Sequence, residues 1–352
     1  MVINSIKLKN FRTYKEREFI FSPETNIFYG NNAQGKTNIL EAIYVCAFGK
    51  SFRTRKDAEL IKFGNEFGGV EVNFKDRYRN KNINFLVSEK SKKQIKINGI
   101  KQLKMSDLFG NLLVVLFSPE DMFFAKGEPG ERRKNFDMVI SQLIPKYMHN
   151  LQEYYKVLEN RNQLIKNGEN RINPVELGVW DEKLAELNVA IRDIREKYVE
   201  KIQPIFFKYH SEISEKKEEV LLKYKTQIKG NKEEILKMLK DRCIQDFRRG
   251  FTSVGIHRDD YVFEINDLNL GLFGSQGQVR TAILSLKLAE KDLIYNEKDE
   301  MPILLLDDVM SELDEKRRKF LYEKLNDCQV FITCTDAIEG KDIKSFEIIK
   351  ED

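Results

Sequence analysis

The chain has 352 residues, of which 41% are hydrophobic and 33% are charged. A chain of this length can bury a sizeable core, so a small disulfide-stapled fold is excluded, and its four cysteines are too scattered for a zinc site. The formal net charge is only +4, but residues 75–104 hold ten basic and two acidic side chains, and residues 131–250 hold 25 basic and 20 acidic ones. Basic charge in the middle of the chain indicates a polyanionic partner.

The first ten residues contain no apolar run of the signal-peptide type. No stretch of the chain approaches the ~18 consecutive apolar residues that span a bilayer. We therefore expect a cytoplasmic protein without a membrane segment.

The first 129 residues alternate strand-like segments with one helix. Three short strands lead into a glycine-containing loop and a helix over 37–48, and more strands follow. The predicted strands are Ile3–Leu8, Arg17–Phe21, Asn26–Tyr29, Gly69–Phe74, Ile83–Val87, Gln94–Ile97 and Leu112–Phe117. Asn98-Gly99 is a strong hairpin signal, so the basic segment 75–104 is predicted to be an antiparallel ribbon with lysines on its solvent side.

The segment from about residue 130 to 250 has few glycines and many Glu/Lys pairs at helical spacing, which predicts inserted helices with a turn at Asn167-Gly168. Strands and helices alternate again after Gly255. The predicted elements are Tyr261–Ile265, the loop 271–277, a helix over 278–296, Ile303–Leu306, a helix over 316–325 and Val330–Cys334. We predict an α/β head built from both termini (1–129 and 253–352), with a mainly helical second domain (130–252) inserted between its halves.

Residues 30–37 fit the phosphate-loop pattern GxxxxGK[ST] between an apolar strand and a helix start. Backbone amides there would cradle phosphates, Lys36 would neutralise the β and γ oxygens, and the Thr37 hydroxyl would hold Mg²⁺. The alternative without a function is a glycine turn that caps a helix. The predicted nucleotide-binding residues are Gly30, Asn31, Asn32, Ala33, Gln34, Gly35, Lys36, Thr37 and Asn38.

The apolar run 303–306 ends in two carboxylates, as a Walker B strand does. Asp307 would hold Mg²⁺ and Asp308 would orient or deprotonate the attacking water, which favours hydrolysis over binding alone. The alternative is a buried strand that ends in an acidic turn.

The segment Gly274-Ser275-Gln276-Gly277-Gln278 opens a predicted helix and forms a second helix N-terminus suited to an anion. Two such N-termini for one γ-phosphate suggest that two chains share the nucleotide. Taken alone, this segment is equally well explained as a helix N-cap.

These elements in this order resemble the RecF family, whose head domain is shared with SMC proteins and other ABC-type ATPases. Further short motifs carry the same resemblance, and it extends from the first strand to Asp336. These motifs are Lys9-Asn10-Phe11-Arg12, Gly49-Lys50-Ser51-Phe52-Arg53, Phe117-Ser118-Pro119-Glu120-Asp121, Gly127-Glu128-Pro129, Arg132-Arg133, His257-Arg258-Asp259-Asp260 and 307–314.

The resemblance implies a P-loop ABC-type ATPase that dimerises head to tail on ATP. The segment 274–278 would be the signature loop, in which Ser275, with Gly277 and Gln278, would contact the γ-phosphate in the opposite subunit. Residues 311–314 would form the D-loop, and Arg12 would reach the nucleotide. Lys36, Ser275 and Asp308 would be the catalytic residues. It further implies binding of duplex DNA near single-strand/double-strand junctions, and cooperation with RecO and RecR in loading RecA.

The sequence departs from ABC transporters at three places. Gly274 replaces a leucine, Asp308 replaces a glutamate, and the segment 331–336 has no switch histidine, so that Thr335 or Asp336 would substitute. These departures predict slow hydrolysis. The missing switch histidine, Asp308 and the basic ribbon count against a transporter's nucleotide-binding subunit. A small-molecule kinase is a further alternative, but it needs neither the signature loop nor a second Walker B carboxylate.

The lysines of the basic ribbon have two readings. They are either a solvated sheet edge or contacts to the DNA backbone that are independent of base sequence. The candidate DNA-binding residues are Lys81, Lys90, Lys92, Lys93 and Lys96.

Overall fold

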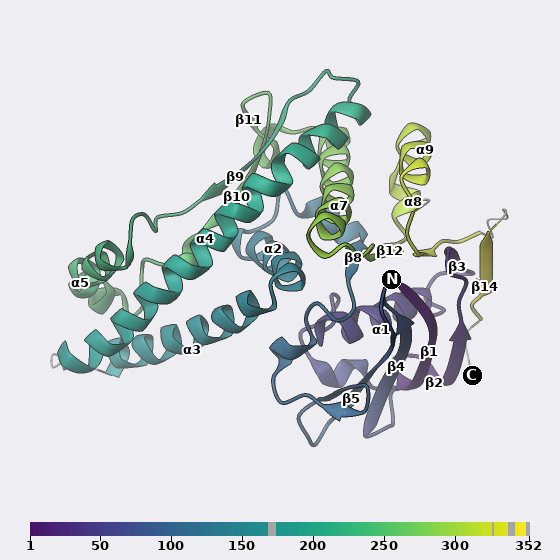
Figure 1. The fold of residues 1–352 in the computed structure, drawn as a ribbon, viewed down its shortest axis with the longest axis horizontal. Coiled ribbons are helices and arrows are strands. Elements are labelled where there is room, and N and C mark those ends of the chain that lie inside the picture. The colour runs from purple at the N-terminus through teal and green to yellow at the C-terminus, as the bar shows by residue number, and fades with distance from the viewer. Residues whose placement is uncertain (168–173, 326, 337–341, 350–352) are drawn as a thin grey trace.

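The structure is a computed structural model that describes residues 1–167, 174–325, 327–336 and 342–349. Two β-sheets enclose helix α1 (Lys36–Phe48) at one end of the molecule, and long helices extend from this head as an arm (Figure 1). In the part of the chain described here, no helix is long and apolar enough to cross a membrane.

A five-stranded parallel sheet combines both ends of the chain in the order β14-β3-β13-β12-β8. Its strands are β3 (Thr25–Tyr29), β8 (Val114–Phe117), β12 (Ile303–Asp307), β13 (Val330–Thr333) and β14 (Ile343–Glu347). The inner strands are continuous apolar runs, as strands covered on both faces are. Because β3 lies between two strands from the C-terminal part, the predicted α/β head built from both termini is confirmed.

A six-stranded antiparallel sheet has the order β2-β1-β4-β5-β6-β7. Its strands are β1 (Val2–Phe11), β2 (Tyr14–Ile20), β4 (Phe67–Lys75), β5 (Asn80–Ser88), β6 (Gln94–Ile97) and β7 (Ile100–Lys101). Asn98 and Gly99 take positive φ angles of 51° and 79° in the β6–β7 turn, as a two-residue type I′ hairpin requires. The predicted antiparallel pairing of the basic segment is therefore confirmed.

Helix α1 is buried between the two sheets, because it is apolar around almost its whole circumference. It contacts β1, β4 and β5 of one sheet and β8, β12 and β13 of the other. Phenylalanine rings join the sheets beside it, with Phe21 at 4.8 Å from Phe331 and Phe19 at 5.7 Å from Phe346 between ring centroids. This packing fixes the helix directly behind the phosphate loop.

The inserted segment forms most of the arm. Its helices are α2 (Pro129–Leu143), α3 (Pro145–Asn167), α4 (Pro174–Ile213) and α5 (Lys232–Arg249). Helix α4 runs along α3 and α5 and also packs on α7 (Gln276–Lys298) of the head (Figure 1). The turn predicted at Gly168 lies outside the described residues, and the domain boundaries 130 and 252 stay predictions.

Three strands were not expected from the sequence, the two-residue β11 (Leu268–Asn269) and the longer β9 (Val220–Lys225) and β14. Residues 220–225 form β9 instead of helix, pairing with β10 (Asp260–Ile265) and β11 in a three-stranded sheet, and 343–347 form β14 at a sheet edge. In both, the pairing partner determines the structure, since neither segment shows a clear local strand pattern. The remaining helices are α6 (Leu270–Phe273), α8 (Val309–Glu312) and α9 (Glu315–Glu323), with 3₁₀ turns at Asp57–Leu60, Met105–Leu108, Pro119–Phe123 and Ile256–Arg258.

A buried polar network ties the arm together. The Arg195 guanidinium is fully buried, and it donates to Asp137 Oδ1 at 2.9 Å, Asp259 Oδ2 at 3.1 Å and Tyr147 Oη at 2.8 Å. Because a buried charge is tolerated only when it is paired and hydrogen-bonded, these partners hold α2, α3, α4 and the segment before β10 in one arrangement.

His257 belongs to the same region. Its Nδ1 lies 2.6 Å from the Tyr154 hydroxyl and its Nε2 lies 3.1 Å from the Thr252 carbonyl oxygen. Burial, together with the neighbouring Arg258 and Arg133, lowers the pKa of His257 from 6.5 to about 4, although the hydrogen bond to Thr252 acts in the opposite direction. The ring is therefore neutral at pH 7 and has a packing role.

The pKa of His257 predicts a pH dependence of stability. Between pH 6.5 and about 4 the unfolded chain binds a proton that the folded chain does not, so stability falls as the pH falls through this window. Urea unfolding at pH 7 and pH 5 should show that the free energy of unfolding decreases less between these pH values for His257→Gln than for the wild type. His149→Gln, on an exposed position of α3, is the control and should match the wild type. Equal pH dependence of stability in all three proteins would contradict the contribution of His257.

Candidate functional site

The phosphate loop connects β3 to α1 and owes its shape to glycine. Gly30 and Gly35 have φ angles of 137° and 105°, and a Cβ on Gly35 would lie 2.7 Å from Thr13 Oγ1. The tip, Asn31 to Ala33, is exposed, and Asn38 is buried in the first turn of α1. Lys36 Nζ donates to the Gly30 carbonyl oxygen at 2.5 Å, so the amine lies over the loop that would hold phosphate.

The hydroxyl and carboxylate proposed for Mg²⁺ meet at the edge of the parallel sheet. Thr37 Oγ1 donates to Asp307 Oδ1 at 2.8 Å, and Thr333 Oγ1 donates to the same oxygen at 2.8 Å. Asp307 is 6% exposed, and this burial raises the pKa of its carboxyl, whereas the two hydroxyls act in the opposite direction. Thr333 was not predicted, although its place at the end of a parallel strand puts it at this edge.

Asp308 follows directly and has a left-handed backbone with φ 50° and ψ 21°. Its amide donates to Thr333 Oγ1 at 2.8 Å, and its side chain is exposed. The turn separates two consecutive carboxylates, one buried and one facing solvent. This arrangement suits one carboxylate for a cation and the other for water.

The Arg12 side chain, near the phosphate loop, is fully engaged by other residues of the chain. It donates from Nε and Nη2 to the two oxygens of Glu41, at 2.8 and 2.6 Å, and from Nη1 to the Glu59 carbonyl oxygen at 2.7 Å. Glu41 is fully buried on α1, and Arg53 lies 3.5 Å from it and 3.0 Å from Asn38 Oδ1. Glu41 thus holds two arginines next to the phosphate loop, a role that the sequence does not reveal.

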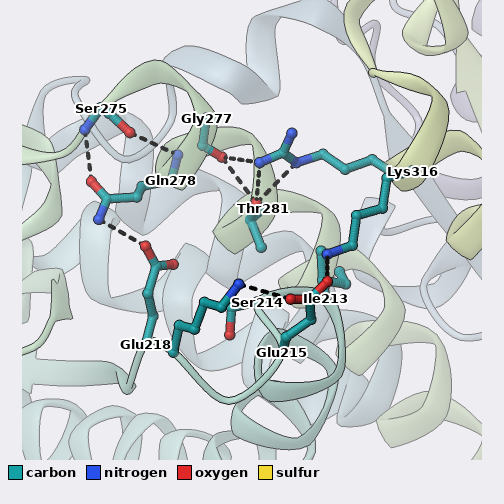
Figure 2. A pocket seen from close by; sticks show the side chains of 11 residues that line it. Ile213, Ser214, Glu215, Glu218, Ser275, Gly277, Gln278, Thr281 and Lys316 are labelled. Atoms are coloured by element: carbon teal, nitrogen blue, oxygen red, sulfur yellow. Dashed lines mark hydrogen bonds and ion pairs between the residues drawn. The ribbon is translucent and has the colours of Figure 1, made fainter.

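The signature loop lies at the start of α7, which begins two residues earlier than predicted. Ser275 and Gln278 form a capping box. Ser275 Oγ accepts a hydrogen bond from the backbone N–H of Gln278 at 3.2 Å, and the side-chain Oε1 of Gln278 accepts one from the backbone N–H of Ser275 at 2.9 Å. Both residues and Gly277 line a pocket of about 300 Å³ (Figure 2). No residue of the phosphate loop lines this pocket, so one chain does not place Ser275 against its own phosphate loop.

The residues proposed as a switch lie close to the phosphate loop. The Thr335 carbonyl oxygen accepts from the Gly30 amide at 3.2 Å, and the Thr335 hydroxyl donates to Asp336 at 2.9 Å. The contact to Gly30 places this segment beside the loop, and both residues stay candidates.

The candidate DNA-binding lysines differ in their surroundings. Lys81 lies 2.6 Å from Asp76, Lys93 lies 3.0 Å from Asp57, and Lys90 pairs with Glu66. Lys92 and Lys96 are exposed, and neither forms an ion pair with any other described residue. These two amines are therefore the most available to a phosphate backbone.

A parallel sheet with a phosphate loop after one strand, an Asp-Asp pair after another and a capped Ser-Gln-Gly helix start defines an ABC-type ATPase head. The family model for the RecF/RecN/SMC N terminal domain matches residues 2–346. A DNA replication and repair protein RecF from Acetivibrio thermocellus is 45% identical over 345 residues, covering 96% of this chain and 94% of the relative. The RecF protein of Clostridium tetani is 44% identical over 343 residues, covering 95% and 93%. The chain belongs to the RecF family of DNA replication and repair proteins.

Solved structures agree with this assignment. The structure of the recombination mediator protein RecF with ATP, from the RecFOR pathway, is 37% identical and covers 99% of this chain and 96% of its own, with a TM-score of 0.93. The Smc head domain of Pyrococcus furiosus shares the fold alone, at 18% identity and a TM-score of 0.53, with 95% and 90% covered.

Proposed function

We propose that this protein binds and slowly hydrolyses ATP, dimerises head to tail on ATP, and binds DNA in recombinational repair and replication-fork maintenance. The observation that carries the proposal is the contact of Thr37 with Asp307 at the mouth of the phosphate loop. Relatives support it, since one of the similar structures is RecF with ATP.

The residues at this edge fit a magnesium nucleotide. A buried carboxylate and a hydroxyl 2.8 Å apart are oxygen ligands of the kind Mg²⁺ prefers when phosphate oxygens and water complete its shell. Within the described residues, no cluster of three or more His, Cys, Asp or Glu side chains forms a separate metal site. Thr37 and Asp307 would hold Mg²⁺, which would neutralise charge on the transferred phosphoryl group, and Lys36 would move from the Gly30 carbonyl oxygen to the phosphates.

Asp308 would act on the attacking water. Its exposed side chain lies one residue beyond the buried Asp307, and its backbone is held by Thr333. An aspartate is shorter than the glutamate found in transporters, which supports slow turnover over rapid cycling. Stimulation of this turnover by DNA would follow from the family.

The dimer would complete the site. Ser275 lines a pocket without any residue of the phosphate loop, which supports a dimer in which the second chain brings its signature loop to the γ-phosphate. Light scattering after size exclusion, in ATP, ADP and DNA, is the direct test, and a protein that stays monomeric with ATP and DNA would contradict the proposal.

The remaining parts of the proposal follow from the family. DNA, including single-strand/double-strand junctions, would bind along the basic ribbon, and RecO and RecR would be partners in loading RecA. Turnover stimulated by DNA and not by membranes would distinguish this function from that of a transporter subunit.

A bulky charge at the signature loop should block the dimer. Ser275→Arg is expected to leave ATP binding by the monomer unchanged and to abolish the ATP-dependent dimer, as measured by light scattering. Asp241→Arg introduces the same side chain on the exposed surface of α5, at the outer end of the arm, and should dimerise normally (Figure 1). A dimer of Ser275→Arg with wild-type affinity would exclude contact of this loop with the opposite chain.

Removal of the second Walker B carboxylate should separate binding from hydrolysis. A positioned general base contributes roughly 10²- to 10⁴-fold, so Asp308→Asn should slow phosphate release by about 10²-fold or more and accumulate the ATP-bound dimer. Glu323→Gln, an exposed carboxylate on α9, is the matched control. Unchanged turnover in Asp308→Asn would remove Asp308 from the reaction.

The exposed lysines of the ribbon should contribute to DNA affinity without regard to base sequence. Lys92→Glu with Lys96→Glu should weaken binding of unrelated duplexes equally and reduce the slope of log affinity against log salt by about 2, one for each contact. Fluorescence anisotropy over a salt series measures this. Arg318→Glu with Lys319→Glu makes the same charge change on α9, and an equal loss there would show that the ribbon has no special role.

A further inference from the structure

The connection between α4 and β9, residues 214–219, contacts the signature loop. It reverses the chain through positive φ angles at Glu215 (56°) and Lys216 (60°). Its side chains line the same pocket as Ser275 and Gln278, although the connection belongs to the inserted segment and the signature loop belongs to the head (Figure 2).

Glu218 is the residue of this connection that touches the signature helix. Gln278 Nε2 donates to Glu218 Oε1 at 2.9 Å, and the Glu218 side chain is only 22% exposed. The orientation of the Gln278 side-chain amide is fixed. Its oxygen accepts from the backbone N–H of Ser275, and its nitrogen faces the Glu218 carboxylate, which can only accept. The whole amide group of Gln278 therefore bridges Ser275 and Glu218 (Figure 2).

Glu218 is anchored on its other side by the arm. His210, fully buried in the last turn of α4, lies with its Nε2 at 3.2 Å from Glu218 Oε2. Since a carboxylate oxygen accepts, His210 carries a proton on Nε2 and donates. One carboxylate thus links a buried side chain of the 40-residue helix α4 to the cap of the signature helix.

The opposite side of the signature loop is held by a different element. Arg317 on α9 donates from Nη2 to the Gly277 carbonyl oxygen at 3.0 Å and to Thr281 Oγ1 at 2.7 Å. Helix α9 directly follows the proposed D-loop. The signature loop therefore has one support from the head and one from the arm.

We propose that Glu218 is a positioning residue through which the inserted arm sets the orientation of Ser275. The inference rests on the proposed function, because Ser275 matters only where it meets a nucleotide across the dimer. A displacement of the end of α4 would move Glu218, then the Gln278 amide, and then the cap at Ser275. Contacts of the arm would in this way control whether the dimer forms.

The test compares Glu218→Ala with Glu218→Gln. Loss of one hydrogen bond to a charged group corresponds to about tenfold in an equilibrium, and a symmetric dimer has two such sites, so Glu218→Ala should weaken the ATP-dependent dimer by about 10- to 100-fold. Glu218→Gln keeps an acceptor for the Gln278 amide and should stay within about threefold of the wild type. ATP affinity of the monomer should be unchanged in both.

Glu219→Ala is the matched control, since its exposed side chain adjoins Glu218 and has no hydrogen bond or ion pair within the described residues. Gln278→Ala should weaken the dimer as Glu218→Ala does, and the double variant should be no worse than either single one. Additive effects, or equal dimer affinity of Glu218→Ala and the wild type, would overturn the proposal.

A second measurement does not depend on the dimer. Amide hydrogen exchange of residues 275–279 in the ATP-free monomer should accelerate in Glu218→Ala and not in Glu219→Ala. If the wild type fails to dimerise with ATP, the proposed function is wrong, while faster exchange would still establish that Glu218 fixes the signature loop. Unchanged exchange would refute the positioning role by itself.

Discussion

The contact between the Thr37 hydroxyl and the Asp307 carboxylate is the constraint on which the rest of the structure depends. These residues are 270 positions apart, and they meet because β3 and β12 lie in one parallel sheet, with β13 between them. Parallel strands end at the same edge, so Thr333 on the middle strand becomes the second hydroxyl on Asp307. The intervening 185 residues between β8 and β12 must therefore leave the sheet and return to it.

Helix α7 connects the segment between β8 and β12 to the candidate site. Its side packs against α4 of the arm and against β8 of the parallel sheet, and its N-terminus carries Ser275. The arm is internally rigid where Arg195 joins its elements, and it reaches the signature loop through Glu218. Helix α7 thus packs against both the parallel sheet and the arm, so a displacement of the arm can reach the sheet through it.

The features that the sequence predicted correctly are those that short stretches of residues determine by themselves. The phosphate loop, the Walker B strand and the Asn98-Gly99 hairpin have short-range patterns, and each lies where it was expected. The strands β9 and β14 were missed because their partners, distant in sequence, supply the pairing. Contacts of single side chains were missed for a similar reason: a glutamate in an apolar helix gives no sign that it holds Arg12, and a threonine ending a strand gives no sign that it serves Asp307.

Two features at the end of β12 are unfavourable for stability alone. Asp307 is buried, and none of the described residues places a cationic group in direct contact with it. Asp308 takes a left-handed conformation, which costs free energy for any residue other than glycine, although aspartate tolerates it better than most. Such costs persist only where the surrounding structure fixes them, and here the Thr333 hydroxyl binds both residues at once. A buried carboxylate, a left-handed turn and a shared hydroxyl thus coincide at the mouth of the phosphate loop, which supports the hydrolysis proposed for this site. A fold selected for stability alone would have no reason to retain this arrangement.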